Sequence, residues 1–432
     1  KEKYRRYNMI KPKHWYGWWI VAICWLTYFI NSGFPMYGGN VANSMMVAQT
    51  EMSRTVLGLG ATLFNLFSGL FGVVVGNLIT KKGAKISMYV GTGAIIVAAL
   101  VMGFLCNGNP VMYIIGYGLI LGIGINFGTA LPLQNTIIFW HDRKRSLSLG
   151  LWATAAGVGS FIASPIMSKL AGNFGWQACW IFVAIAAAVN LVIIKIFLVE
   201  KPSMVGQVQD GYLTNSDTSA DAIKEKKPSR VYKTAVEWEY KDAIKTPTAW
   251  MILLGMCGYF CVYIVVMSQG VNLVLDNGLE ATQAAMLMSA IGIGSLIARP
   301  VFGGISDYVE PRWVWLVMTL VTMAGAFLLK SCNSIVMVYV CGILIGGGFG
   351  GAFVQVPAVI SNYYGKKAYA RIYGLLLPIM NIVTCIAPTV AGAIYDANHS
   401  YDLAINIFVA FGFVGVIGLL FARPPKQKSQ SV

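Results

Sequence analysis

The segment Met286–Asp307 reads MLMSAIGIGSLIARPVFGGISD, an apolar run long enough to cross a bilayer with one charged residue, Arg299, inside it. A hydrocarbon core about 30 Å thick needs about 20 apolar residues in a helix. Placing an arginine at the middle of such a helix costs about 2.5–3.5 kcal/mol on insertion scales. The charge therefore needs a compensating group, and the identity of that group decides how the rest of the chain is interpreted.

The whole chain shares this apolar character. Of its 432 residues, 57% are hydrophobic and 11% are charged, whereas a soluble domain carries about 25% charged residues. The apolar residues come in long blocks, which is typical of an all-α membrane protein with many spans. We predict twelve transmembrane helices, at about 15–40, 55–79, 84–106, 109–139, 145–170, 175–198, 248–275, 280–306, 312–330, 333–363, 369–395 and 400–422.

The net charge of +15 does not indicate a nucleic-acid partner, because the lysines and arginines lie in short segments between apolar blocks. They cluster at both termini and in the connections 81–85, 143–145 and 366–371. Basic connections stay on the cytoplasmic side, so both termini are predicted to be cytoplasmic. We expect an integral membrane protein of a bacterial inner (plasma) membrane, a monomer whose macromolecular surroundings are the lipid bilayer.

One long polar stretch divides the spans six and six. We therefore expect an N-terminal bundle at 1–198, a cytoplasmic linker at 199–247 and a C-terminal bundle at 248–432. Within the linker, Gly206–Arg230 is rich in Ser, Thr, Asp and Lys and is predicted to be flexible. Tyr232–Lys245 has charge spacing compatible with a helix along the membrane surface, and a plain solvated linker is the alternative.

The two halves repeat each other. The motif WHDRKRSLSLGL at 140–151 matches YGKKAYARIYGL at 364–375, since both run from an aromatic residue through a basic cluster into Gly-Leu. Two further pairs have nearly the same offset: Gly122 and Pro132 with Gly347 and Pro357, and Gly76–Thr80 with Gly303–Asp307. Such repeats predict two pseudo-symmetric six-helix bundles with a substrate site near the midplane.

These features resemble the major facilitator superfamily, in the branch of oxalate/formate antiporters and monocarboxylate transporters. The resemblance covers essentially the whole chain and lies in the opening Tyr16–Val21 (YGWWIV), the fifth-span motif that follows Phe139, the seventh-span entry Lys245–Trp250 (KTPTAW) and the eighth-span Ala298-Arg299-Pro300. It implies the major facilitator fold and carriage of a small organic anion. Animal-type monocarboxylate carriers have an Asp where Ser295 stands, so the resemblance implies no neighbouring Asp for proton coupling.

Arg299 lies eight residues before Asp307, or about 12 Å at 1.5 Å per residue, which places it near the midplane. All 17 acidic residues fall in termini, in connections or at the ends of spans. A bound carboxylate, which a guanidinium contacts with two parallel hydrogen bonds, is the interpretation we favour. The alternative is that Arg299 caps carbonyl groups of a neighbouring helix.

Polar residues expected at similar depth complete the predicted substrate site, with ordinary hydrogen bonding between helices as the alternative for each. The repeat pairs Arg299 with Gly72, which leaves room for an organic anion. The substrate-binding candidates besides Arg299 are Tyr28, Asn31, Asn65, Ser68, Asn126, Tyr259, Tyr263, Ser295 and Asn381. A cytoplasmic gating layer is predicted at Asp307, Gly303, Gly76, Lys81 and Lys82, with Lys85 beside them.

The sequence contains no Ser/His/Asp grouping, no nucleotide-phosphate loop and no cluster with metal-ligand spacing, so we predict neither an enzyme nor a cofactor or metal site. The Gly-rich run Gly342–Gly351 indicates close helix packing. We therefore predict a secondary active transporter that moves a monocarboxylate by alternating access, through proton symport or anion exchange. The alternatives are an exporter of drug-like or other small molecules and a transport-silent sensor.

Overall fold

The computed structural model describes residues 14–50, 52–211 and 231–425. The chain forms two compact units, each held by its own internal contacts. Unit 1 comprises Lys1–Lys226 and Tyr373–Asn381, and unit 2 comprises Lys227–Ile372 and Ile382–Val432. The predicted domain boundaries at 198 and 248 stay a prediction.

Eleven helices in the described residues are long and apolar enough to cross a membrane. One of them, Ile335–Asn398, has 64 residues and would be about 96 Å long if straight, three times the thickness of a hydrocarbon core. It breaks at Gly365, whose φ of 82° and ψ of 176° are not helical. The run therefore contains two spans, and the all-helical fold with twelve spans predicted from the sequence is confirmed.

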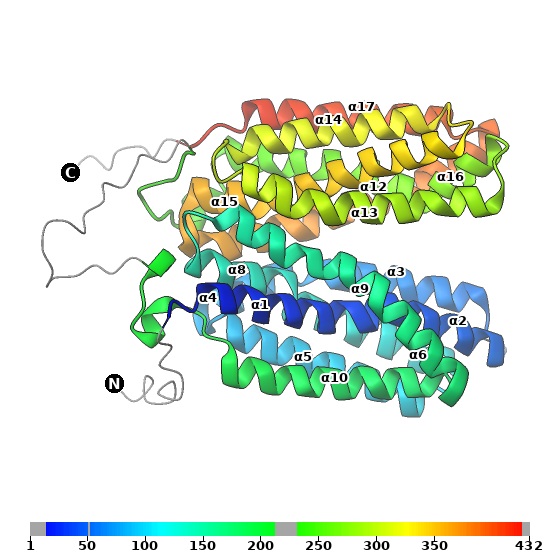
Figure 1. Ribbon diagram of the computed structural model, residues 1–432, viewed down its shortest axis with the longest axis horizontal. Helices are drawn as coiled ribbons and strands as arrows, with labels where there is room; N and C mark the ends of the chain where they lie inside the picture. Colours follow the sequence, from blue (N-terminus) through cyan, green and yellow to red (C-terminus); the bar gives the residue numbers. More distant parts are fainter. Residues whose placement is uncertain (1–13, 51, 212–230, 426–432) are drawn as a thin grey trace, which may run out of the picture. The chain divides into compact units, whose positions relative to one another are not determined.

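Unit 1 holds the first six spans, and three of its helices contain wider π-helical turns, at Phe29–Gly38, Val101–Leu105 and Ile114–Leu121. The most extensive packing is between α9 and the π-helical turn Phe29–Gly38, between α5 and α10, which lie side by side in Figure 1, and between α5 and α7. The helices are α1 Gly17–Tyr28, α2 Gly39–Gln49, α3 Arg54–Leu70, α4 Gly72–Lys82, α5 Ala84–Leu100, α6 Pro110–Tyr113, α7 Gly122–Gly128, α8 Ala130–Trp140, α9 Arg145–Phe174 and α10 Trp176–Phe197.

Unit 2 holds the remaining spans, except that Tyr373–Asn381 of α15 belongs to unit 1. Its helix α12 packs along both α17 and α14, and the three lie side by side in Figure 1. Gly258 of α12 meets Gly415 of α17, where an added Cβ at Gly258 would lie 2.6 Å from the Gly415 Cα, so the two backbones touch as small residues allow. The helices are α11 Tyr240–Ala243, α12 Pro247–Asp276, α13 Ala281–Ile305, α14 Pro311–Leu329, α15 Ile335–Cys385, α16 Ala387–Asn398 and α17 Asp402–Phe421.

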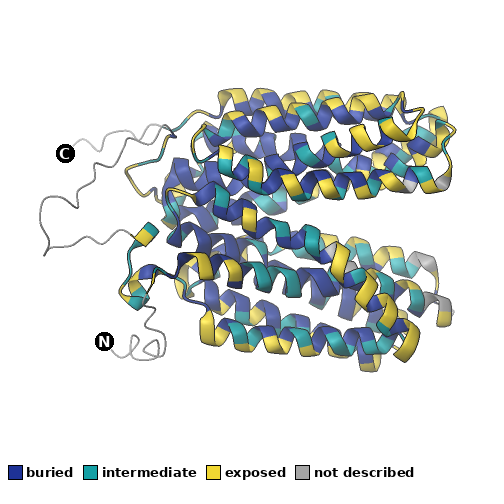
Figure 2. Ribbon diagram, in the orientation of Figure 1, coloured by how far each residue is buried: buried dark blue, intermediate teal, exposed yellow. Residues whose placement is uncertain are grey.

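The outer faces of the helices are apolar and exposed. On α10, Ile185, Val189, Val192 and Ile196 are each more than half exposed and recur every three or four residues, which places them on one face. The opposite face of α10 is buried, and the other helices show the same two-sided pattern (Figure 2). An exposed apolar stripe of this length fits contact with lipid tails.

The linker is only partly described. Residues 212–230 of the segment predicted to be flexible lie outside the described residues. On the unit 1 side, Pro202–Val205 and Gln209–Gly211 form short 3-10 turns. On the unit 2 side, the predicted surface helix over Tyr232–Lys245 is wrong except for the single turn α11.

The segment Val231–Glu239 instead lies along the break in α15. Its backbone amides at Thr234 and Trp238 donate to the carbonyls of Asn362 and Tyr364, at 2.8 and 3.2 Å. The predicted helix does not form over this segment because the carbonyls of Asn362 and Tyr364 lie where α15 is interrupted and need hydrogen-bond donors. Glu237 adds a carboxylate that accepts from the amide of Lys367 at 2.8 Å.

Replacing Gly365 with alanine should lower the stability of the purified protein by about 2–4 kcal/mol. Its positive φ and extended ψ are accessible to glycine, and an added Cβ would overlap the Glu237 carboxylate. Thermal unfolding in detergent measures the loss. Gly175→Ala is the matched control, because its φ of 84° and ψ of 165° lie in the same backbone region, while its added Cβ would meet only the end of the Gln177 side chain, at 3.1 Å. Equal losses at both positions would contradict the role assigned to the Glu237 contact.

Candidate functional site

Arg299 lies in α13, six residues before the helix ends at Ile305. The residue is 9% exposed, and its guanidinium carbon lies 5.4 Å from the centre of the Phe353 ring. Pro300 has no N–H, so the carbonyl of Leu296 loses its helical donor one turn away. The charge thus sits in a buried part of a span, where one neighbour is the negative face of an aromatic ring.

The glycine-rich stretch of α15 packs against α13 at Ile291 and Ser295, in the two turns before Arg299. A Cβ at Gly346 would overlap the carbonyl of Ile291, and one at Gly350 would lie 2.6 Å from the carbonyl oxygen of Ser295. Close helix packing by Gly342–Gly351 is therefore confirmed. Ser295 itself is 7% exposed, one turn before Arg299.

An aromatic stack next to Arg299 is the feature that the sequence analysis missed. Phe353 lies 6.0 Å from Phe349, and Phe349 stacks on Tyr263 with ring centres 3.5 Å apart and planes 7° from parallel. Tyr259 contacts the same Phe349 ring at 5.8 Å. The signal in the sequence was the four-residue spacing of Tyr259 and Tyr263, and of Phe349 and Phe353, which puts each pair on one helix face.

Asn31, in the first span, takes part in a buried hydrogen-bond network of unit 1. Its amide nitrogen donates to Thr92 Oγ1 at 2.9 Å and to the Gly128 carbonyl at 3.3 Å, and its amide oxygen accepts from Asn190 at 2.9 Å. Thr27 Oγ1 in turn donates to Asn190 at 3.2 Å. This geometry is the hydrogen bonding between helices that the sequence analysis held as the alternative to substrate contact.

Three other unit 1 candidates lie together on α3 and α7. The Asn65 amide donates to the Ala61 carbonyl of its own helix at 3.0 Å, and Ser68 Oγ donates to the Asn65 carbonyl at 2.8 Å. The Asn126 amide donates to the Ser68 carbonyl and joins the two helices. Their place in a substrate site stays a prediction.

Tyr28 and Asn381 are half-buried in unit 1. The Tyr28 ring stacks on Trp152 at 4.6 Å. Asn381 lies against Gly69, and the buried Gly72 is covered by Gly374 and Pro378, since an added Cβ would lie 2.5 Å from the Gly374 oxygen and 3.0 Å from Pro378. The space next to Gly72 is therefore occupied by helix packing.

The predicted gating residues lie at the ends of their helices near the linker. Gly303 and Gly76 are buried, Asp307 is half-buried just after α13, and Lys81 and Lys82 are exposed. Their gating role stays a prediction.

Lys85, near the predicted gating residues Lys81 and Lys82 in the sequence, binds the end of α10. Its ammonium donates to the carbonyls of Lys195 and Leu198 at 3.0 and 2.8 Å, at the end of α10.

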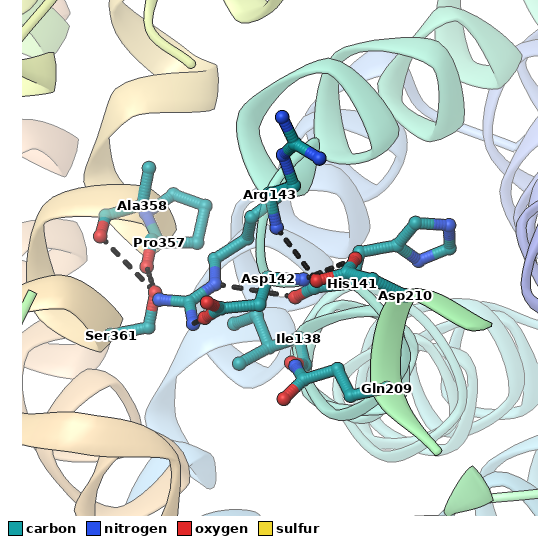
Figure 3. Close-up of polar contacts among 10 residues, drawn as sticks. Ile138, His141, Asp142, Arg143, Gln209, Asp210, Pro357, Ala358 and Ser361 are labelled. Atoms are coloured by element: carbon teal, nitrogen blue, oxygen red, sulfur yellow. Dashed lines mark hydrogen bonds and ion pairs between the residues drawn. The ribbon is translucent and has the colours of Figure 1, made fainter. Parts of the chain in front are cut away.

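Each unit binds one end of the linker at its copy of the repeated motif. In unit 1, the Asp210 carboxylate accepts from the backbone amides of Asp142 and Arg143 at 2.9 and 3.0 Å (Figure 3). The Trp140 indole donates to the carbonyl of Val199 at 2.8 Å. A carboxylate here satisfies orphan amides before α9 and complements the positive end of the helix.

Unit 2 repeats this arrangement at the matching positions. Lys367 aligns with Arg143 in the repeat. Its backbone amide donates to the Glu237 carboxylate, and its ammonium donates to Glu239 Oε1 at 2.6 Å. The hydrogen bond from Lys367 holds the pKa of Glu239 below its ordinary value. Tyr364, which aligns with Trp140, shares a hydrogen bond of 2.5 Å with Thr246.

Glu310 fixes the start of the unit 2 segment. Its carboxylate accepts from the Tyr232 amide at 3.0 Å, and burial raises its pKa above the ordinary value. The linker ends are thus anchored through carboxylates on backbone amides.

The fold and the repeat define a membrane transporter built from two six-span halves. The family model for the Major Facilitator Superfamily matches residues 20–276 and 251–432. The chain belongs to this superfamily, so it is a secondary transporter for a small molecule and not an enzyme.

Similar proteins include two that are named monocarboxylate transporters. The chain is 22% identical to zebrafish (Danio rerio) monocarboxylate transporter 12-B, with 96% of this chain and 88% of that protein covered. It is 22% identical to human monocarboxylate transporter 14, with 94% and 89% covered. It is also 24% identical to the MFS-type transporter pynF of Aspergillus niger, with 95% and 90% covered.

Solved structures support the fold. The Escherichia coli fucose:proton symporter FucP superposes with a TM-score of 0.69 at 14% identity, covering 95% of this chain and 100% of that one. The human organic anion transporter MFSD10 gives 0.69 at 13% identity, covering 96% and 99%.

The stability of the protein should fall as the pH drops from about 7 to about 4, in part through His141. Its buried imidazole lies between Trp15 and Trp18, 5.0 Å from each ring, and burial lowers its pKa from 6.5 to about 4. The unfolded chain binds the proton first as the pH falls, so the contribution is complete above about pH 6.5 and lost toward pH 4. The loss is about 2 kcal/mol at pH 5.

His141→Phe keeps an aromatic ring but cannot titrate, so we expect a shallower fall in thermal stability between pH 7 and pH 5. His14→Gln, at an exposed histidine, is the control and should keep the wild-type slope. An unchanged slope in His141→Phe would contradict the prediction.

Asn31→Leu should lower the free energy of unfolding by about 1–3 kcal/mol, because it leaves polar groups of Asn190 and Thr92 without their partner inside the bundle. Thermal unfolding of the purified variant measures the change. Asn65→Leu is the control, since Asn65 is exposed and donates to its own helix. A stable Asn31→Leu variant with lost ligand binding would instead assign Asn31 to the substrate.

Proposed function

We propose that this transporter carries a small organic anion, most simply a monocarboxylate, and that Arg299 binds its carboxylate. The observation that carries the proposal is the buried guanidinium inside an apolar span. Ionisable residues inside transmembrane segments are costly and are commonly functional. A guanidinium also matches the two oxygens of a carboxylate, which a lysine ammonium cannot do in the same geometry.

The similar proteins support the chemical class. Two of those described above are named monocarboxylate transporters, and a protein of the same fold is named an organic anion transporter. The charge of Arg299 suits an anion, whereas an exporter of cationic drugs would need an acid at that depth, and the sequence places its acids at the ends of spans or outside them.

The remaining candidate residues take secondary roles in this proposal. Ser295 lies one turn before Arg299 in α13, and Tyr263 belongs to the aromatic stack that begins at Arg299. Asp307 and Lys81 belong to the gating layer, with both termini in the cytoplasm. Proton symport and anion exchange both remain compatible with an arginine as the binding group.

Carboxylates should raise the thermal unfolding temperature of the wild-type protein, and Arg299→Ala should abolish this effect. A ligand at 100 times its Kd adds about 2.7 kcal/mol of stability. We expect Arg299→Lys to weaken binding at least tenfold, because the ammonium cannot form the paired hydrogen bonds. A panel of acetate, propionate, pyruvate and succinate would be compared by thermal shift.

Lys169→Ala removes an exposed cation from α9 and is the matched control, so it should retain the full ligand effect. If stabilisation persists in Arg299→Ala, the carboxylate site lies elsewhere. If Arg299→Lys binds as well as the wild type, the paired-hydrogen-bond argument is wrong. Uptake into proteoliposomes driven by a pH gradient, or by an internal anion, separates symport from exchange.

A further inference from the structure

The aromatic stack beside Arg299 lies in the middle of its helices. Tyr263 is 16 residues after the start of α12 at Pro247 and 13 before its end at Asp276. Phe349 and Phe353 are 14 and 18 residues after the start of α15 at Ile335. Tyrosine and tryptophan of membrane proteins gather at the two water interfaces, so Tyr263 stacked on Phe349 at mid-span needs another reason.

The stack begins at the charge. The Arg299 guanidinium lies over Phe353, Phe353 contacts Phe349, and Phe349 stacks on Tyr263. The line therefore joins a cation to three rings in sequence, all within unit 2. A guanidinium lying over a ring gains electrostatic stabilisation from the ring face, while its N–H donors point outward in the guanidinium plane and suit a carboxylate.

The centre of the stack is more buried than its two ends. Phe349, in its centre, is 6% exposed, and Tyr259 behind it is 2% exposed. Tyr263 and Phe353 are only half-buried, so both keep part of their surface open on unit 2. The buried rings hold the half-buried ones in place, which gives a rigid aromatic surface next to the cation.

We propose that the preferred substrates are carboxylates with a planar aromatic body, whose ring packs on Phe353 and Tyr263 while the carboxylate pairs with Arg299. This inference rests on the proposed function, because it names the substrate class of the same site. A ring placed on this surface gains offset or edge-to-face aromatic contacts that a saturated ring of similar size does not make. Short aliphatic acids would contact Arg299 but leave the aromatic surface unused.

The test compares three acids on the purified full-length protein: phenylacetate, cyclohexylacetate and propionate. We expect phenylacetate to bind about fivefold more tightly than cyclohexylacetate, and both more tightly than propionate, by thermal shift and calorimetry. Phe353→Leu should reduce the ratio of phenylacetate to cyclohexylacetate affinities to about one.

Tyr263→Leu is a second variant that keeps the inference testable if Phe353→Leu does not fold, and it should also lower the ratio. Phe413→Leu, at a ring 51% exposed on α17, is the matched control and should leave the ratio unchanged.

Equal, Arg299-dependent binding of phenylacetate and cyclohexylacetate would overturn the aromatic inference and leave the carboxylate function standing. The same holds if the preference survives in both leucine variants, because another surface would then select the ring. Failure of all three acids to bind in an Arg299-dependent way would overturn both proposals.

Discussion

The structure depends on one constraint, that every backbone polar group near the hydrocarbon core finds a partner within the protein. Long helices meet it along their length, but a helix start leaves amides without acceptors. In this chain, carboxylates that follow the sixth span supply several of the missing acceptors. Glu200 accepts from Lys85 at the start of α5, Asp210 from Asp142 and Arg143, and Glu237 from Lys367.

These acceptors explain why the linker is more than a spacer. Its two ends bind the same position of the repeated motif in each unit, so the motif's aromatic residue and backbone amides have a structural use. Trp140 and Tyr364 both hydrogen-bond to the linker, although one donates to a carbonyl and the other meets a hydroxyl. The repeated motif thus corresponds to a repeated contact with the linker. A linker that was only solvated would make no such contact.

The fold was predictable because its signal is long and redundant. The twelve apolar blocks predict twelve membrane spans, and helix starts such as Ala84, Arg145 and Pro247 fall within a few residues of their predicted places. The linker was not predictable in the same way. Charge spacing over Tyr232–Lys245 allows a helix, but the interruption of α15 at Gly365 creates tertiary hydrogen bonds that local sequence does not reveal.

The candidate site shows the same division. Arg299 stands out in the sequence because one charge in an apolar block is rare and costly, so composition alone identifies it. Asn31 and Asn65 have similar prominence in the sequence, yet one joins a buried network and the other is exposed. Phe349 and Phe353 show only a four-residue spacing, which is common for phenylalanine in apolar spans, and the contact of Phe353 with Arg299 is what distinguishes them. A charge predicts its own importance, whereas the shape of the ligand that it binds depends on which neutral residues the fold brings beside it.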